Sequence, residues 1–470
     1  MSPLISQNYA ALPEILFTPA ALQHVATPEL VIANDGLAAE LGIQRDWLHG
    51  PEALQMLSGN QPAAHGKPLA MAYAGHQFGG FNAKLGDGRA MLLGDITVAD
   101  GSKRELHLKG SGRTVYSRSG DGRATLSAML REYILSEAMA ALGVPTTRSL
   151  SVMVTGEAVM RQRPEKGAVL TRVAKSHVRV GTFQYLSVRG ETEAIRALMN
   201  HEIARAMPKV SGPTAFLREV LKRQSQLIAQ WMSFGFIHGV MNTDNAQIAG
   251  ETIDYGPCAF MDAFNPQKVF SSIDEHGRYA YDKQPAIGLW NMTRLAECLL
   301  PLLDENPDSA VKIAEAELGN FMPMFEDAFK ERMLAKLGIR DSSHATFVTK
   351  TLQEMANGRA DFTRFFTALT RGDAVRGFFH SDQAHDEWLA QWNSLRASDA
   401  ATLMHKNNPV YIARNHRVEV ALQAAEASDF EPLHQLLAVV QKPFEARPEF
   451  TEYENAPDAR EEVLQTFCGT

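Results

Sequence analysis

A chain of 470 residues is too long for one ordinary hydrophobic core, so we expect two or three compact parts. Hydrophobic residues at 45% and charged residues at 21% are typical of a globular protein, and a net charge of −8 gives no support to a nucleic-acid-binding surface. No apolar run approaches the ~20 residues that span a bilayer, so we expect no membrane partner.

The N-terminal residues and the cysteines bear on location. The start, MSPLISQNYAALPEILF, lacks the basic segment and the long apolar run of a signal peptide. The three cysteines, Cys258, Cys298 and Cys468, form no C-x-x-C pair, and so sparse a set fits a reducing compartment. We therefore expect a cytoplasmic bacterial protein, with an organelle as the alternative.

Residue patterns divide the chain into four regions. Residues 1–65 mix short apolar runs with Pro and Gly and are expected to form an extension packed on a core. Residues 66–190 combine strand patterns with one strong helix, residues 191–304 are mainly helical, and residues 305–470 are helical until an acidic tail. Strands followed by helices predict an α+β fold with two unlike lobes and a cleft between them.

Within these regions, individual elements follow in chain order. The expected strands are residues 90–93, 105–109, 150–154 and 168–173. The expected helices are residues 124–142, ended by Gly143 and Pro145, and residues 215–234 and 287–303. A short hairpin is expected to turn at Gly250, and Pro409, Pro432 and Pro443 are expected to break the C-terminal helices.

Two Gly-rich turns are candidates for phosphate binding. In Gly86-Asp87-Gly88-Arg89, the glycines let the backbone approach an anion closely and point N–H groups at it. The alternative is an ordinary hairpin turn, for which Asp-Gly is a common signal. The similar Gly120-Asp121-Gly122-Arg123 has different flanks, so we treat it as an independent turn rather than a repeat.

Lys109 ends a predicted strand and precedes a predicted helix. Kinases use this order for a lysine that touches phosphates and a glutamate on the next helix that holds the lysine. Glu132 and Glu137 are the candidates, and helical phase places Glu137 closer to the apolar face. Arg172 and Arg179 flank the end of the strand at 168–173 and suit bidentate phosphate contacts. The alternative is a set of exposed side chains in surface ion pairs.

The segment richest in chemistry runs from His238 to Asn245 with the sequence HGVMNTDN, and Asp254-Tyr255-Gly256 follows it. Protein kinases carry H-R-D-L-x-x-x-N and then D-F-G, where the first Asp is the base and the Asn and second Asp hold metal ions. Here Val240 stands where the kinase base belongs, and Asp244 supplies an acid instead. The pattern predicts nucleotide chemistry on a kinase-like scaffold that need not be phosphorylation.

Asn245 and Asp254 offer hard oxygen ligands of the kind that Mg²⁺ or Mn²⁺ prefers. The turn at Gly250 would bring the two residues together, while His238 is expected to be a core histidine. A chance occurrence in a helical region is the alternative interpretation. H-E-x-x-H, G-x-S-x-G and Walker motifs are absent from the sequence.

Across nearly its whole length, the chain resembles the selenoprotein O (SelO-like) family of pseudokinases. The matching segments are YAGHQFGGFNAKLGDGRAMLLGD, LKGSGRT, DGRATLSAMLREYILSEAMAALGVPTTRSL, LTRVAKSHVRVGTFQY, HGVMNTDNAQIAGETIDYGPCAFMD and NPVYIARNHRVEVAL. The resemblance implies a protein-kinase-like two-lobed fold with an N-terminal extension and additional C-terminal helices. It also implies transfer of AMP from ATP, bound flipped relative to kinases, to Ser, Thr or Tyr hydroxyls of protein substrates.

The same resemblance implies residue roles in this chain. Asp244 would be the general base, and Asn245 and Asp254 would hold Mg²⁺ or Mn²⁺. Glu132, rather than Glu137, would hold Lys109. The residues implied to contact ATP are Gly86, Gly88, Arg89, Lys109, Asp121, Gly122, Arg172, Arg179 and Asp254, with Lys109 and the two arginines on the far phosphates.

A flipped nucleotide is also physically intelligible. Arg172 and Arg179 lie in the segment where a kinase places adenine, and buried arginines without counter-charges are costly. A triphosphate is therefore expected to bind beside these arginines in preference to the adenine base. Cys468 matches a cysteine or selenocysteine of the family, but residues 264–274 contain no second cysteine and Cys258 is not an obvious substitute, so no disulfide switch carries over.

Three other functions stay open at this point. The first is transfer of UMP from UTP, because contacts to the base cannot be read from the sequence. The second is phosphorylation, against which Val240 counts. The third is an inactive ATP-binding scaffold, against which the presence of Asp244 together with Asn245 and Asp254 counts.

Overall fold

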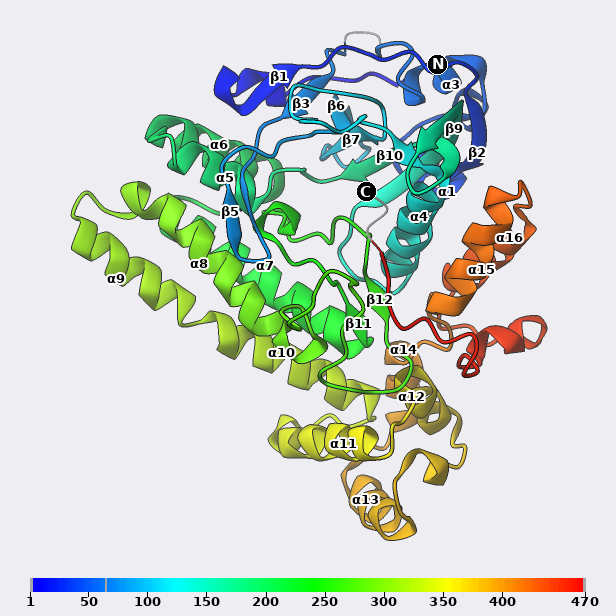
Figure 1. Cartoon of the computed structure of the whole chain (residues 1–470). Helices are drawn as coiled ribbons and strands as arrows, with labels where there is room; N and C mark the ends of the chain where they lie inside the picture. Colours follow the sequence, from blue (N-terminus) through cyan, green and yellow to red (C-terminus); the bar gives the residue numbers. More distant parts are fainter. Residues whose placement is uncertain (1–2, 64–65, 468–470) are drawn as a thin grey trace.

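The computed structural model describes residues 3–63 and 66–467 (Figure 1). An eight-stranded sheet lies at one end of the molecule, and helices make up the rest. Its strands follow the order β1-β3-β6-β7-β10-β9-β2, with β8 paired to β10, and the pairs are antiparallel. The strands are β1 (Phe17–Pro19), β2 (Glu29–Ala33), β3 (Leu69–Met71), β6 (Ala90–Thr97), β7 (Lys103–Lys109), β8 (Ala124–Thr125), β9 (Arg148–Met160) and β10 (Pro164–Ala174).

The sheet forms a middle layer with a core on each face. Successive side chains of a strand point to opposite faces, so neighbours on β10 join different cores. Leu170 packs in the core that includes helix α4 (Leu126–Ala141), whereas Val169 packs in a second core. Three short helices supply that second core: α1 (Asp35–Glu40), α2 (Arg45–Leu48) and α3 (Pro51–Leu57). Residues 17–57 thus provide both edge strands and one covering layer of the sheet.

Helix α4 begins and ends where the sequence signals predict. Its N-cap is Thr125, whose side chain accepts a hydrogen bond from the N–H of Ala128. Gly143 follows the helix with a φ of 76°, a left-handed geometry that favours glycine. The expected helix at 124–142 is confirmed, except that its first two residues form strand β8.

The remaining chain is mainly helical, as expected, and the fold is mixed α+β. The helices are α5 (Val180–Ser187), α6 (Thr192–Ala206), α7 (Pro213–Ser233), α8 (Gln284–Leu303), α9 (Pro307–Leu318), α10 (Phe321–Lys336), α11 (Ala345–Asn357), α12 (Phe362–Arg371), α13 (Asp382–Leu395), α14 (Ala400–Asn407), α15 (Asn415–Glu426) and α16 (Glu431–Val440). Short strand pairs are β4 (Gly75–Gln77) with β5 (Gly80–Asn82), and β11 (Phe236–Ile237) with β12 (Ala259–Phe260). Helices α15 and α16 return to pack beside α4 (Figure 1).

Two local expectations were wrong. Pro432 does not break a helix but lies in the first turn of α16, where its missing N–H costs nothing. The chain does turn at Gly250, but the two arms of the turn do not pair with each other. Gln247 pairs with Arg179 and Thr252 pairs with Thr146, because both arms find partners in the segments that flank the sheet. In the described part of the chain, no helix is long and apolar enough to cross a membrane.

Candidate active site

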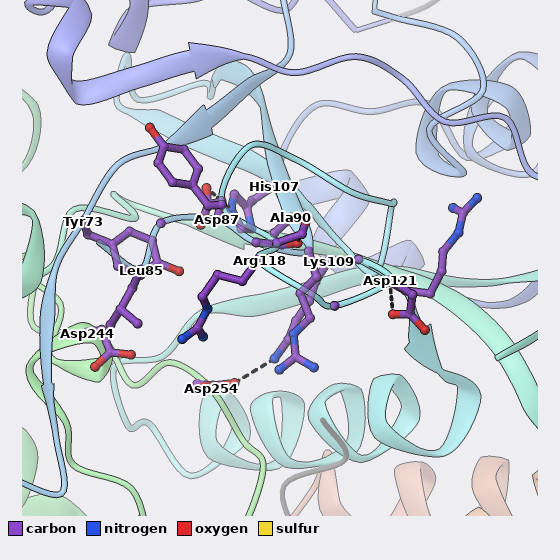
Figure 2. A pocket seen from close by; sticks show the side chains of 18 of the residues that line it. Tyr73, Leu85, Asp87, Ala90, His107, Lys109, Arg118, Asp121, Asp244 and Asp254 are labelled. Atoms are coloured by element: carbon purple, nitrogen blue, oxygen red, sulfur yellow. Dashed lines mark hydrogen bonds and ion pairs between the residues drawn. The ribbon is translucent and has the colours of Figure 1, made fainter. Parts of the chain in front are cut away.

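A cavity of about 620 Å³ is lined by β6, β7, β10 and the segment from Asp244 to Asp254. Figure 2 shows Asp244 at one end of this cavity and Asp121 at the other. The cavity brings together every residue that the sequence assigned to the nucleotide, the metal or the base: Gly86, Gly88, Arg89, Lys109, Asp121, Gly122, Arg172, Arg179, Asp244, Asn245 and Asp254. Glu132 lies behind Lys109 and lines a neighbouring pocket.

Four side chains form a connected ionic cluster, here called the cation cluster: Lys109, Glu132, Arg172 and Asp254. Lys109 Nζ lies 2.6 Å from Glu132 Oε2 and 2.7 Å from Asp254 Oδ1 (Figure 2). Arg172 Nη2 lies 2.5 Å from Glu132 Oε1. Burial raises the pKa of Glu132 and of Asp254, but their cationic neighbours outweigh it and both pKa values are lowered. Both carboxylates are therefore held ionised.

The partner of Lys109 is Glu132, as the family resemblance implies and contrary to helical phase. Glu137 is also buried, but it binds Arg148 at 2.7 Å and the Asn34 side chain at 2.8 Å. Helical phase was misleading because α4 is covered on several sides, so a glutamate can be buried away from the apolar stripe if a cation meets it there.

His238 supports the segment that carries Asp254. Its side chain is buried, and its Nε2 lies 2.9 Å from the carbonyl oxygen of Ile253. Burial lowers the pKa of His238, so the neutral ring donates this hydrogen bond. The expectation of a core histidine is confirmed, and the backbone of Asp254 takes a φ of 70° directly after this contact.

Asp244 is a buried carboxylate of the site with few hydrogen-bond donors, and is here called under-bonded. It lies in a short turn, Thr243–Asn245, and only 8% of its surface is exposed. Gln77 Nε2 donates to Asp244 Oδ2 at 3.2 Å, while Oδ1 has no hydrogen-bond partner among the described residues. Burial raises the pKa of Asp244 to about 6, against the attraction of Arg179. A carboxylate with a pKa near neutrality suits proton transfer.

The donor set at Asn245 and Asp254 fits a magnesium-type ion. Asn245 donates through Nδ2 to the carbonyl oxygen of Val240 at 3.0 Å, which leaves the amide oxygen as its available donor atom. Asp254 uses one carboxylate oxygen for Lys109 and keeps the other. Within the described residues, no group of three or more His, Cys, Asp or Glu could hold a metal by itself. Mg²⁺ bound through two protein oxygens and substrate phosphates needs no such cage.

The Gly86–Arg89 turn is not an ordinary hairpin turn. Strand β6, which follows it, pairs with β3 and β7 and not with β5. Gly86 has a φ of 71°, and a Cβ there would lie 2.2 Å from the ring of Tyr116. Gly122 also has a φ of 71°, and its Cβ would lie 2.2 Å from the backbone of Gly112. Both glycines therefore allow a close backbone approach at the cavity wall.

Two further predicted side chains, Arg179 and Asp121, differ in how close their ion-pair partners lie. Arg179 lies at the start of α5, and its guanidinium is 4.3 Å from the ring centroid of Tyr73 and 3.9 Å from Asp87. Asp121, in contrast, forms a 2.7 Å ion pair with Arg161 at the far end of the cavity. Arg179 Nη1 also donates to the backbone carbonyl oxygen of Asp244 at 3.1 Å, so its close partners are neutral and its ion-pair partner is more distant than that of Asp121.

Sequence reasoning missed several residues of the site. Gln77 contacts the candidate base, and Asp87 lies 3.1 Å from His107 in a buried pair at the cavity wall. Asp87 belongs to the Gly86-Asp87-Gly88-Arg89 motif, so the motif itself is a signal that could have identified its carboxylate. No periodicity or spacing marks Gln77, because its partner Asp244 is far away in the chain.

The cysteines add little to the site. Cys258 and Cys298 are buried free thiols, and burial raises the pKa of each to about 12, so neither is reactive. Cys468 lies outside the described residues.

Comparison with known proteins identifies the family of this chain. Residues 5–441 match the family described as Protein adenylyltransferase SelO. The chain is 51% identical to Protein nucleotidyltransferase YdiU of Rhodopseudomonas palustris strain BisB5 and 49% identical to the protein of that name from Bradyrhizobium diazoefficiens, in each case over 98% of both chains. The chain therefore belongs to the SelO family.

Proposed function

We propose that this enzyme transfers AMP from ATP to Ser, Thr or Tyr hydroxyls of protein substrates, in a kinase-like two-lobed fold. The proposal rests on one observation: an under-bonded buried carboxylate, Asp244, shares a cavity with the cation cluster. The family description names adenylyl transfer, and the relatives' names give nucleotidyl transfer to proteins. The sparse cysteines favour a reducing, cytoplasmic setting for this activity.

In the proposed reaction, Asp244 accepts the proton of the substrate hydroxyl. The hydroxyl oxygen attacks the α-phosphorus of ATP, the bond from that phosphorus to the bridging oxygen breaks, and pyrophosphate leaves. The pKa of about 6 lets Asp244 be ionised near neutral pH and still hold the proton it receives. Val240, which stands in the place of the kinase base, has no proton-accepting group.

The proposal includes a flipped nucleotide. Among the residues that the structure describes, no carboxylate lies closer to Arg179 than Asp87 at 3.9 Å, and a triphosphate end would supply a closer anionic partner. Lys109 and Arg172 would face the same phosphates from β7 and β10. A divalent ion, Mg²⁺ or Mn²⁺, held by Asn245 and Asp254 would neutralise phosphate charge.

Labelled nucleotides test this proposal directly. The enzyme is incubated with protein substrates and with ATP labelled at the α- or at the γ-phosphate, and with α-labelled UTP. Protein-bound label from α-labelled ATP alone is the expected result. Label from the γ-phosphate would mean phosphorylation, stronger label from UTP would mean uridylyl transfer, and no label from any nucleotide would favour a scaffold.

A further inference from the structure

A short hairpin from the sheet end of the molecule lies directly against residues 242–245, here called the catalytic loop after its proposed role. It comprises β4 and β5, which pair only with each other in the described chain, and it reaches towards α8 (Figure 1). The N–H of His76 donates to Thr243 Oγ1 at 2.7 Å, and the N–H of Phe78 donates to Asn242 Oδ1 at 3.0 Å. The ring of His76 also packs on Trp290 of α8, with centroids 5.0 Å apart. These contacts fix the hairpin beside Asp244.

The hairpin also forms part of the cavity rim beside Asp244. A Cβ on Gly75 would lie 2.6 Å from Asp244 Oδ1, so the bare glycine permits this close approach. Gln77 is exposed, lines the cavity and donates to Asp244. Asp244 itself is only 8% exposed, and Gln77 is the exposed hairpin residue next to it, so we take the hairpin as the side from which a substrate side chain approaches.

The outer side of this rim carries aromatic rings and a cation. Phe81, at the end of the hairpin, is 42% exposed. The guanidinium of Arg278 lies 4.9 Å from the ring centroid of Trp290 and beside the hairpin turn, where a Cβ on Gly79 would be 3.7 Å away. Exposed aromatic side chains and arginines are the residue types that contribute most to binding protein partners.

Arg278 is a cation without an anionic partner in residues 3–63 and 66–467. It forms no ion pair there, its Nε has no hydrogen-bond partner, and its guanidinium lies 5.7 Å from the ring centroid of Tyr279. Arg294, which also stacks on Trp290, is neutralised by Glu297 at 2.7 Å. Arg278 is not among the residues that line the nucleotide cavity, so phosphates of the nucleotide do not supply its counter-charge. The protein has a net charge of −8, so a cation without an ion-pair partner at this rim, Arg278, favours the binding of an acidic ligand.

We propose that Gly79–Phe81, Arg278 and Trp290 form an acceptor platform, which docks a substrate segment with a carboxylate close to its reactive hydroxyl. The inference rests on the proposed function and adds the class of substrate. The carboxylate pairs with Arg278, an apolar neighbour packs on Phe81, and the hydroxyl reaches Asp244 past Gln77. Acidic Ser, Thr or Tyr segments are therefore the preferred acceptors.

Matched peptides test the charge preference. Synthetic peptides with a single tyrosine or serine flanked by aspartates are compared with asparagine- and lysine-flanked counterparts. Binding is measured by fluorescence anisotropy, and transfer by label from α-labelled ATP. We expect the aspartate peptides to bind and react roughly tenfold better than the lysine peptides. Equal binding of all peptides would overturn the platform.

Variants then locate the preference. Arg278→Glu is expected to reverse the order of the aspartate and lysine peptides, and Phe81→Ser to weaken binding of all of them, with ATP affinity unchanged in both. The control is Arg396→Glu, because Arg396 likewise stacks on a tryptophan, Trp392, at 5.2 Å, but in the distant C-terminal helices. A preference that survives Arg278→Glu would overturn the inference.

The two readouts separate this inference from the proposed function. Transfer without any dependence on Arg278 would remove the platform and leave the adenylyl transfer standing. Arg278-dependent binding of acidic peptides without transfer of AMP would leave the platform standing and remove the proposed reaction. Absence of both binding and transfer would overturn both.

Discussion

The cation cluster and the catalytic loop each place a buried carboxylate in the same cavity, with opposite consequences. In the cluster, Glu132 and Asp254 contact Lys109 at 2.6 and 2.7 Å, and the pKa of each carboxyl is lowered. In the loop, Asp244 has a single side-chain donor, Gln77, and burial raises its pKa to about 6. Burial is shared, so the difference comes from the partners.

This difference distinguishes the cation cluster, which holds fixed charges, from Asp244, which is suited to proton transfer. A carboxylate with close cations stays ionised and keeps neighbouring groups in place. A buried carboxylate without such partners destabilises the folded protein when ionised, and it accepts a proton readily. Substitutions in the two regions should therefore have opposite effects on stability and distinct effects on activity.

The largest effect is expected for Asp244→Ala. Loss of a general base lowers the rate of transfer by ~10²–10⁴. ATP affinity should stay unchanged, because Lys109 and Arg172 remain. Single-turnover transfer from α-labelled ATP and calorimetric titration with ATP measure the two quantities. Asp254→Ala serves as the comparison, since it should lose transfer and ATP affinity together; equal loss of affinity in both variants would contradict the separate roles.

Breaking the cation cluster should cost the most stability. Glu132→Gln leaves Lys109 and Arg172 buried with less counter-charge, so we expect a loss of about 3 kcal/mol in the free energy of unfolding. Urea unfolding without nucleotide measures it. Glu419→Gln is the control, because Glu419 is 40% exposed in its ion pair with Arg131 and should change stability by ~1 kcal/mol or less. A similar small loss for Glu132→Gln would show that water, not Glu132, satisfies the cations.

In the catalytic loop the sign should reverse. The pKa of Asp244 is about 6 in the folded protein against 3.8 as its ordinary value. The folded state thus binds the proton of Asp244 more tightly, so the contribution of Asp244 to stability is greatest at low pH and is lost as the pH rises from about 4 to about 6. Asp244→Asn removes this loss and should stabilise the protein at neutral pH by up to about 3 kcal/mol. Unfolding of the metal-free protein across this pH range measures it; an unchanged pH slope would contradict the raised pKa.

The smallest effect is expected for Arg179→Ala. This variant tests whether the β- and γ-phosphates of ATP bind beside Arg179. If Arg179 binds the β- and γ-phosphates, its loss should weaken ATP by ~1.5–3 kcal/mol and AMP much less. Arg189→Ala is a matched control, because Arg189 stacks on Tyr185 at 3.7 Å and does not line the cavity. Calorimetric titrations with both nucleotides measure the effect. Equal weakening of ATP and AMP would remove the support for a flipped nucleotide.

Much of the fold follows from local patterns. Alternating residues locate parts of β6, β7, β9 and β10, and the 3.6-residue period locates α4, α7 and α8 to within a few residues. The edge strands β1 and β2 were not expected, because strands of so few residues carry little pattern of their own. Gly250 marks a turn, but which segments its arms would pair with depended on distant partners.

The sequence by itself determined the inventory of the site: a strand lysine before a glutamate-bearing helix, two arginines, and the motif from His238 to Asp254. Only the tertiary structure decided which glutamate Lys109 meets, that Asp244 Oδ1 has no hydrogen-bond partner among the described residues, that Gln77 contacts Asp244, and that Arg278 lies beside the hairpin turn. The physical reason is the distance along the chain over which each kind of interaction acts. Hydrogen-bonded periodicity acts over a few residues, whereas burial and ion pairing depend on how segments far apart in the chain pack against one another.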